Sequence, residues 1–97
     1  MATYIILTKY TQQGIQNIKE SPARFDAAKK AMQSMGADLK QVFLTMGQYD
    51  LVVIAEAPDD ETIAKFALVT GALGNVSTQT MRAFTEDEFR KIVAGLP

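Results

Sequence analysis

The stretch that decides the fold is Met46-Gly47-Gln48-Tyr49-Asp50, because it connects two strongly apolar segments that are expected to pair as neighbouring strands. Residues 37–46 and 49–57 are rich in Val, Leu, Ile and Phe, which favour β-structure. Between them, Gly47-Gln48 is a two-residue Gly-X connection. Such a connection predicts a type II′ hairpin with a positive φ at the glycine.

The elements before the hairpin follow from the same kind of pattern. Residues 3–10 are rich in β-branched and aromatic side chains and predict a first strand. Residues 11–20 show no sustained period and indicate a loop, with room for a short turn of helix. Ser21-Pro22 then supplies an N-cap and a first-turn proline for an amphipathic helix, which Gly36 ends.

After the hairpin, the sequence predicts a second helix, a fourth strand and a third helix. Asp59-Asp60-Glu61 lies where the N-terminus of a helix favours negative charge, and Gly71 and Gly74 end this helix. Residues 75–84 form a more polar fourth strand. Thr85-Glu86-Asp87-Glu88 has the sequence of a capping box and begins a short C-terminal helix.

The order is strand, helix, strand, strand, helix, strand, with a helix added, and it predicts a ferredoxin-like α+β fold. The 97 residues are expected to form a single domain, 1–97, whose antiparallel sheet has helices on one face. Residues 4–7 and 51–55 are continuous apolar runs of the kind buried on both sides. We therefore expect another subunit to cover the bare face, in a homodimer or a higher oligomer.

The hairpin also assigns side chains to the two faces of the sheet. Pairing across the turn places Leu44 opposite Leu51 and Val42 opposite Val53, and this apolar set is expected to face the helices. The alternate set is expected on the open face, together with polar and aromatic positions of the first and fourth strands. These open-face residues are Gln41, Phe43, Thr45, Asp50, Val52, Ile54, Glu56, Tyr4, Ile6, Thr8, Tyr10, Thr78, Thr80 and Arg82.

The composition excludes several classes of function. There is no Cys and no His, which removes thiol nucleophiles, thiolate and imidazole metal sites and the ordinary proton shuttle at neutral pH. The ten Lys and Arg are scattered and the formal net charge is -1, so no surface for nucleic acid or for an anionic membrane is expected. The start of the chain lacks the basic region of a signal peptide. We expect a cytoplasmic protein that holds no metal and no cofactor.

Several stretches along the chain, taken together, carry a family resemblance. They are residues 3–7, 13–15, 17–19, 47–50, 57–62, 73–76 and 82–89. With these stretches the chain resembles the GYD-domain family over nearly its whole length. The resemblance implies a ferredoxin-like domain related to the dimeric α/β-barrel proteins, and it implies no settled biochemical activity.

Four residues are candidates for binding a small ligand: Tyr10, Thr45, Asp50 and Arg82. Asp50 begins a strand on an otherwise apolar face, where an unpaired carboxylate is costly, so it either pairs structurally or acts on a ligand as an acid or base. Tyr49 is the second catalytic candidate, and otherwise an aromatic residue at the edge of the core. Arg82 either pairs with an acid or anchors an anionic ligand.

Two functions from different classes fit these observations. The first is a non-catalytic protein, either small-ligand-binding or an accessory or assembly protein, that works as a homo-oligomer. The alternative is a cofactor-independent isomerase, lyase or monooxygenase acting on a small organic acid, with Asp50 as acid or base and Arg82 as carboxylate anchor. This alternative rests on fold analogy. It requires Asp50 and Arg82 to line one closed pocket of ligand size.

Overall fold

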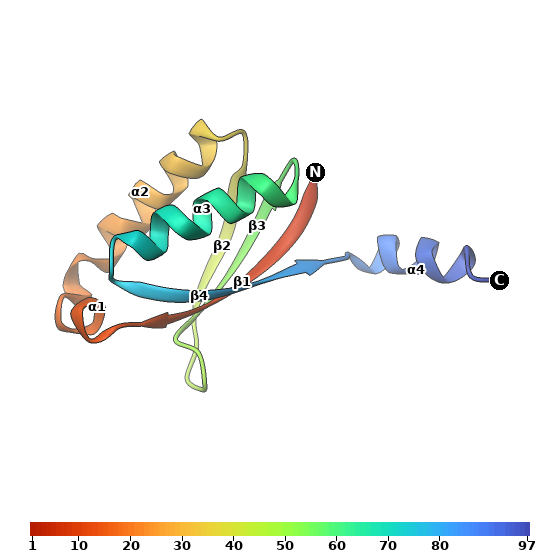
Figure 1. Cartoon of the computed structure of the whole chain (residues 1–97). Helices are drawn as coiled ribbons and strands as arrows, with labels where there is room; N and C mark the ends of the chain where they lie inside the picture. Colours follow the sequence, from red (N-terminus) through yellow and green to blue (C-terminus); the bar gives the residue numbers. More distant parts are fainter.

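The computed structural model describes all 97 residues and contains a four-stranded antiparallel sheet with its two long helices on one face (Figure 1). The elements are β1 Ala2–Tyr10, α1 Gln12–Gln16, the 3-10 helix η1 Ile18–Glu20, α2 Ser21–Ser34, β2 Asp38–Leu44, β3 Leu51–Ala57, α3 Asp60–Ala72, β4 Val76–Ala83 and α4 Glu86–Ala94. The strand order is β2-β3-β1-β4. The fold is ferredoxin-like α+β, which confirms the prediction.

The hairpin between β2 and β3 has the expected register but not the expected turn. Leu44 pairs with Leu51, and the Thr45 amide donates to the Asp50 carbonyl at 2.8 Å. The connection is therefore longer than two residues, and Gly47 has no positive φ. The predicted type II′ turn is wrong, because a longer loop can join two strands in the same register.

The first strand presents the opposite face from the one expected. Tyr4, Ile6 and Thr8 are buried under the helices, and Tyr10 alternates with them onto the same side, whereas Ile5 and Leu7 lie on the open face. Polar atoms at the tips of Tyr and Thr side chains suggested an outward position. A tyrosine can nevertheless bury its ring and still extend its hydroxyl to a polar partner at the margin of the core.

The side chains of β4 are assigned to the two faces of the sheet by its pairing with β1. Thr78 pairs with Thr8 and Thr80 with Ile6, so both threonines share the helix-covered face, contrary to the expectation. Arg82 pairs with Tyr4 and belongs to the same set. Most assignments made from the hairpin itself hold, because the register puts Gln41, Phe43, Val52, Ile54 and Glu56 on the open face beside alternate residues of β1. The strand register ends at Leu44 and Leu51 and does not extend to Thr45 and Asp50.

The core lies between the sheet and the two long helices. Met32 of α2 and both Ile63 and Phe66 of α3 pack with Tyr4 and Ala55 of the central strands. Ala28 and Ala31 of α2, and Met35 at its C-cap, pack against the same core as Met32, and Ile63 and Phe66 are three residues apart in α3. Each helix therefore has one apolar face, and both faces pack on the same side of the sheet.

Three helix ends have defined end chemistry, and those at Gly36 and Thr85 are the ones that the sequence predicts. Gly36 follows α2 with a φ of +78°, which ends the helix in the left-handed region that glycine tolerates. Asp59 caps α3, its side chain accepting from the Thr62 amide at 2.8 Å. At α4 the capping box of Thr85 and Glu88 is complete.

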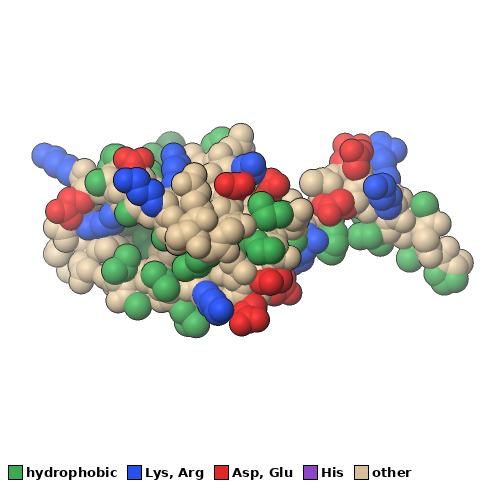
Figure 2. Space-filling view, turned by 90° about the horizontal axis from the view of Figure 1, so that it is seen from above, with side chains coloured by type: hydrophobic (Ala, Val, Ile, Leu, Met, Phe, Trp, Pro, Cys, Tyr) green, Lys and Arg blue, Asp and Glu red, His purple; other side chains and the backbone are tan.

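The last helix, α4, extends away from the sheet and leaves its apolar face uncovered (Figure 1). Figure 2 shows it as a separate projection, with charged side chains along one side and hydrophobic side chains along another. Four hydrophobic residues at helical spacing on it or just beyond it are between 45% and 64% exposed: Phe89, Ile92, Val93 and Leu96. None of the helices combines the length and the apolar character needed to cross a membrane.

Candidate functional site

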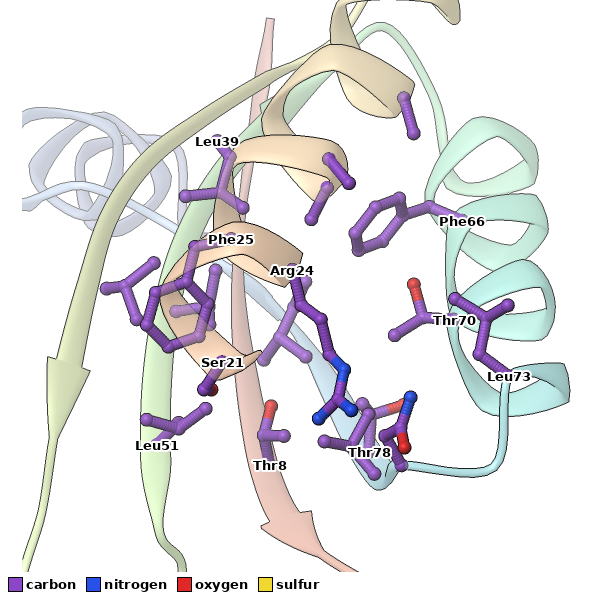
Figure 3. Close-up of a pocket in the computed structure, with 18 of the residues that line it drawn as sticks. Thr8, Ser21, Arg24, Phe25, Leu39, Leu51, Phe66, Thr70, Leu73 and Thr78 are labelled. Carbon is purple, nitrogen blue, oxygen red and sulfur yellow. The ribbon is translucent and has the colours of Figure 1, made fainter. Parts of the chain in front are cut away.

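The helix-covered side of the sheet contains a cavity between α2, α3 and the strands (Figure 3). Its volume is about 280 Å³, and 14 of its 20 lining residues are hydrophobic. Phe25 of α2 and Phe66 of α3 form walls, whereas Ala28 and Ala31 of α2 have side chains too small to fill the space between the helices. The result is an apolar chamber within one subunit.

The lower part of this cavity in Figure 3 brings polar groups together. Thr8 and Thr78 are paired on the floor, and Arg24 reaches across from α2 as the one charged lining residue. Arg24 Nη2 donates to Glu20 Oε2 at 2.7 Å. Arg24 Nη1 is buried, and no protein acceptor lies within hydrogen-bonding distance of it.

A second hollow, of about 610 Å³, adjoins the first and shares Tyr10, Ser21 and Phe25 with it. Lys29 and Lys40 border this second hollow. The structure holds no cluster of three or more acidic side chains that could bind a metal ion.

Tyr10 is the one predicted ligand-binding residue that lines both hollows. Its hydroxyl lies 2.6 Å from Ser21 Oγ, and its amide donates to Asp50 Oδ2 at 2.9 Å. The Ser21 hydroxyl therefore bonds Tyr10 and does not cap α2. Ser21 has helical φ and ψ of -57° and -43°, and the N-cap of α2 is Glu20. The prediction of Ser21 as the N-cap is wrong. The Asp50 carboxylate satisfies a strand amide outside the cavity, which is a structural use of that charge.

Thr45 and Tyr49 hold the hairpin loop in place. The Thr45 hydroxyl donates to the Tyr49 carbonyl at 2.6 Å, and the Tyr49 hydroxyl donates to Gln79 Oε1 at 2.5 Å. Gln79 pairs with Leu7 and so belongs to the open face of the sheet. Neither Thr45 nor Tyr49 lines a hollow.

Arg82 lies far from Asp50. Its guanidinium stands over the rings of Phe84 and Tyr4, at 4.3 Å and 5.7 Å from their centroids, and donates to the Thr3 and Ala83 carbonyls. Arg82 pairs with Tyr4 and Asp50 bonds Tyr10, and these partners are about 20 Å apart along β1. The structure thus does not bring Asp50 and Arg82 into one pocket.

Arg24 was missed in the sequence, although a signal for it exists. It precedes Ala28 by four residues and Ala31 by seven, so helical spacing already places it on the inner face of α2. Lys and Arg are scattered along the chain, and nothing near Arg24 in the sequence distinguishes it from the surface cations. The sequence alone therefore does not mark Arg24 as a pocket residue.

The fold and these surfaces define a small ferredoxin-like α+β protein with an apolar cavity between its two long helices and the sheet. The sequence profile of the GYD domain matches residues 4–93, so the chain belongs to the GYD domain family.

Two individual proteins are similar to this chain. A protein of Thermus thermophilus, named glutamine synthetase and cystathionine beta-lyase binding protein, is 29% identical over 84 residues, which are 86% of this chain and 88% of that protein. The crystal structure of TTHA0845, also from Thermus thermophilus, aligns with a TM-score of 0.53 at 24% identity, covering 88% of this chain and 95% of that chain. This second likeness shows the fold.

Proposed function

We propose that this chain is a non-catalytic binding or accessory protein of the cytoplasm, and that its working form is at least a homodimer joined through the open face of the sheet. The observation that carries the proposal is the chemistry of this face. Its centre is apolar, formed by Ile5, Leu7, Val52 and Ile54 of the two central strands, with Phe43 and Met81 beside them.

Polar side chains surround this apolar centre. Thr3 and Glu56 lie at one end of the central strands, Lys9 at the other, and Gln41 and Gln79 on the edge strands. An apolar centre with a polar rim is the usual anatomy of a protein interface. Both long helices cover the other side of the sheet (Figure 1), so no element of the same chain occupies this face.

The whole chain buries few residues on its own. Only 13 of 97 residues are buried. A domain of this size gains little stability from its own core, and burial against a second copy would add to it.

The name of the Thermus thermophilus relative describes binding to two enzymes. We propose that this chain likewise binds another protein. The enzyme alternative, by contrast, requires Asp50 and Arg82 in one pocket, and the two residues line neither hollow.

The test is the oligomeric state of the full chain by sedimentation equilibrium, with Ile54→Lys as the disrupting variant. Ile54 pairs with Ile5 at the centre of the open face, so a charge there would be buried on association. We expect a dimer or higher oligomer for the wild type and at least a tenfold weaker association for Ile54→Lys, corresponding to about 1.4 kcal/mol or more.

Ala64→Lys is the matched control, because it adds the same charge at an exposed position of α3, which lies on the other side of the sheet. It should associate like the wild type. A monomeric wild type at high concentration, or equal association of Ile54→Lys and wild type, would refute the interface.

A further inference from the structure

We propose that the cavity between α2, α3 and the sheet binds an organic acid with an apolar body, and that Arg24 holds its carboxylate. The cavity lies on the opposite side of the sheet from the open face, so this inference stands apart from the proposed homodimer. Three properties of the cavity lead to this class of ligand: its apolar lining, its single charge and its size.

The lining requires a mostly apolar ligand. With 14 hydrophobic residues among 20, the chamber offers little to a sugar or a nucleotide, which would need many polar partners. The rings of Phe25 and Phe66 and the methyl groups of Ala28 and Ala31 instead form a surface that favours an aliphatic or aromatic body.

The single charge favours an anionic ligand. No Asp or Glu lines the cavity, and Glu20, the partner of Arg24, has a side chain that is 66% exposed to solvent. Arg24 Nη1 is buried without a protein acceptor, which is costly for a charged donor and is unusual in folded proteins. A ligand carboxylate would satisfy this donor, since the planar guanidinium matches the geometry of a carboxylate.

The neighbouring hydroxyl groups suit the same anion. Thr8 and Thr78 lie on the strand floor on the side of the cavity to which the Arg24 guanidinium extends (Figure 3). Hydroxyl groups can donate to a carboxylate oxygen that the guanidinium leaves free. The cation and the hydroxyls therefore form one polar end in an otherwise apolar chamber.

The size limits the apolar body. The volume is about 280 Å³. An engineered apolar cavity of about 150 Å³ accepts benzene. This chamber therefore accommodates a body about twice that size, such as a medium-chain alkanoic acid or a bicyclic aromatic acid.

The probe for the test is octanoate, used below its micellar concentration and titrated calorimetrically into the full chain. Octan-1-ol provides the same apolar body without the charge. We expect octanoate to bind and octan-1-ol to bind at least about tenfold more weakly, because the alcohol cannot form a charge-assisted pair with Arg24.

The decisive variant is Arg24→Met, which keeps the length of the side chain and removes the guanidinium. It should weaken octanoate binding about ten- to a hundredfold and leave octan-1-ol binding unchanged. Arg90→Met is the matched control, because Arg90 also pairs with an acid four residues earlier, Glu86 at 2.7 Å, but lies on α4 away from the cavity. It should bind octanoate like the wild type.

The place of binding is read from the aromatic NMR signals of the wild type, so this part of the test does not depend on the folding of any variant. Octanoate should shift the ring signals of Phe25 and Phe66, which line the cavity, and not those of Phe43 on the open face. Absence of octanoate binding, equal binding by Arg24→Met, or shifts confined to Phe43 would overturn the proposal.

Discussion

At the residue scale, Tyr4 shows how a polar aromatic side chain is accommodated in this core. It is 2% exposed, and its hydroxyl donates to Asp60 Oδ1 at 2.5 Å, at the first turn of α3. Burial, followed by the hydrogen bond and the negative charge of Asp60, raises the pKa of Tyr4 to about 12. The residue therefore links the central strand to the start of a helix as a neutral phenol.

The raised pKa predicts that the free energy of unfolding decreases between pH 10 and about 12. Below pH 10 both states keep the proton and the contribution of Tyr4 is complete. Above it the unfolded chain loses the proton first and binds fewer protons than the folded chain, so stability falls as pH rises. Tyr4→Phe should remove this part of the pH dependence, remove the phenol transition near pH 12, and cost about 1–2 kcal/mol at neutral pH.

Urea denaturation at a series of pH values and an ultraviolet titration of the phenols provide the two measurements. Parallel loss of stability in the wild type and in Tyr4→Phe above pH 10 would contradict the assignment.

At the element scale, α1 is held against the connection between α3 and β4 by close backbone contact. A Cβ placed on Gly14 would lie 2.0 Å from the Asn75 carbonyl oxygen, which also accepts from the Thr11 amide at 3.0 Å. The Thr11 hydroxyl donates to the Gly74 carbonyl at 2.6 Å. Asn75 lines the cavity, so these contacts of Thr11 and Gly14 with residues 74–75 close one end of the cavity.

Gly14→Ala should therefore destabilise the protein by about 2 kcal/mol or more, because the new methyl group displaces backbone that cannot move as a flexible side chain would. Gly71→Ala is the control, since Gly71 lies in α3 with no atom within 4 Å of the added carbon. It should be neutral or stabilise the protein by up to about 1 kcal/mol. Urea denaturation of both variants measures the difference, and equal effects would show that the contact with Asn75 is not important.

The elements that could be predicted from the sequence depend on near neighbours along the chain. The helix end at Gly36 and the capping box at Thr85 involve residues within one helical turn, and the register of β2 and β3 follows from a short connection. The face of β1 could not be predicted in the same way, because the hydroxyl of Tyr4 finds its partner 56 residues away. The place of Arg24 in a cavity could not be predicted for a similar reason, because the cavity forms only when α2 and α3 both pack on the sheet.

At the scale of the whole molecule, the shape is more extended than a domain of this length requires. The radius of gyration is 14.6 Å, compared with about 12.5 Å for a compact chain of similar length. The projecting α4 accounts for this shape (Figures 1 and 2). Its nine residues are fewer than the roughly 12–15 that an isolated helix needs to be even marginally stable in water. The apolar face of α4, like the open face of the sheet, would therefore gain the most stability from burial against a second molecule.

If the proposed oligomer also covers α4, a charge on the apolar face of that helix should weaken association. Ile92→Lys is expected to raise the dissociation constant at least about tenfold, because the ammonium group would lose its water in the interface. Ala94→Lys adds the same charge about 200° around the helix from Ile92 and should associate like the wild type. Sedimentation velocity over a dilution series measures association, and amide hydrogen exchange of α4 measures its order. The exchange of α4 in the wild type should slow as concentration rises, whereas in Ile92→Lys it should stay fast. Equal dissociation constants for the two variants, or exchange independent of concentration, would place α4 outside the interface and restrict association to the sheet.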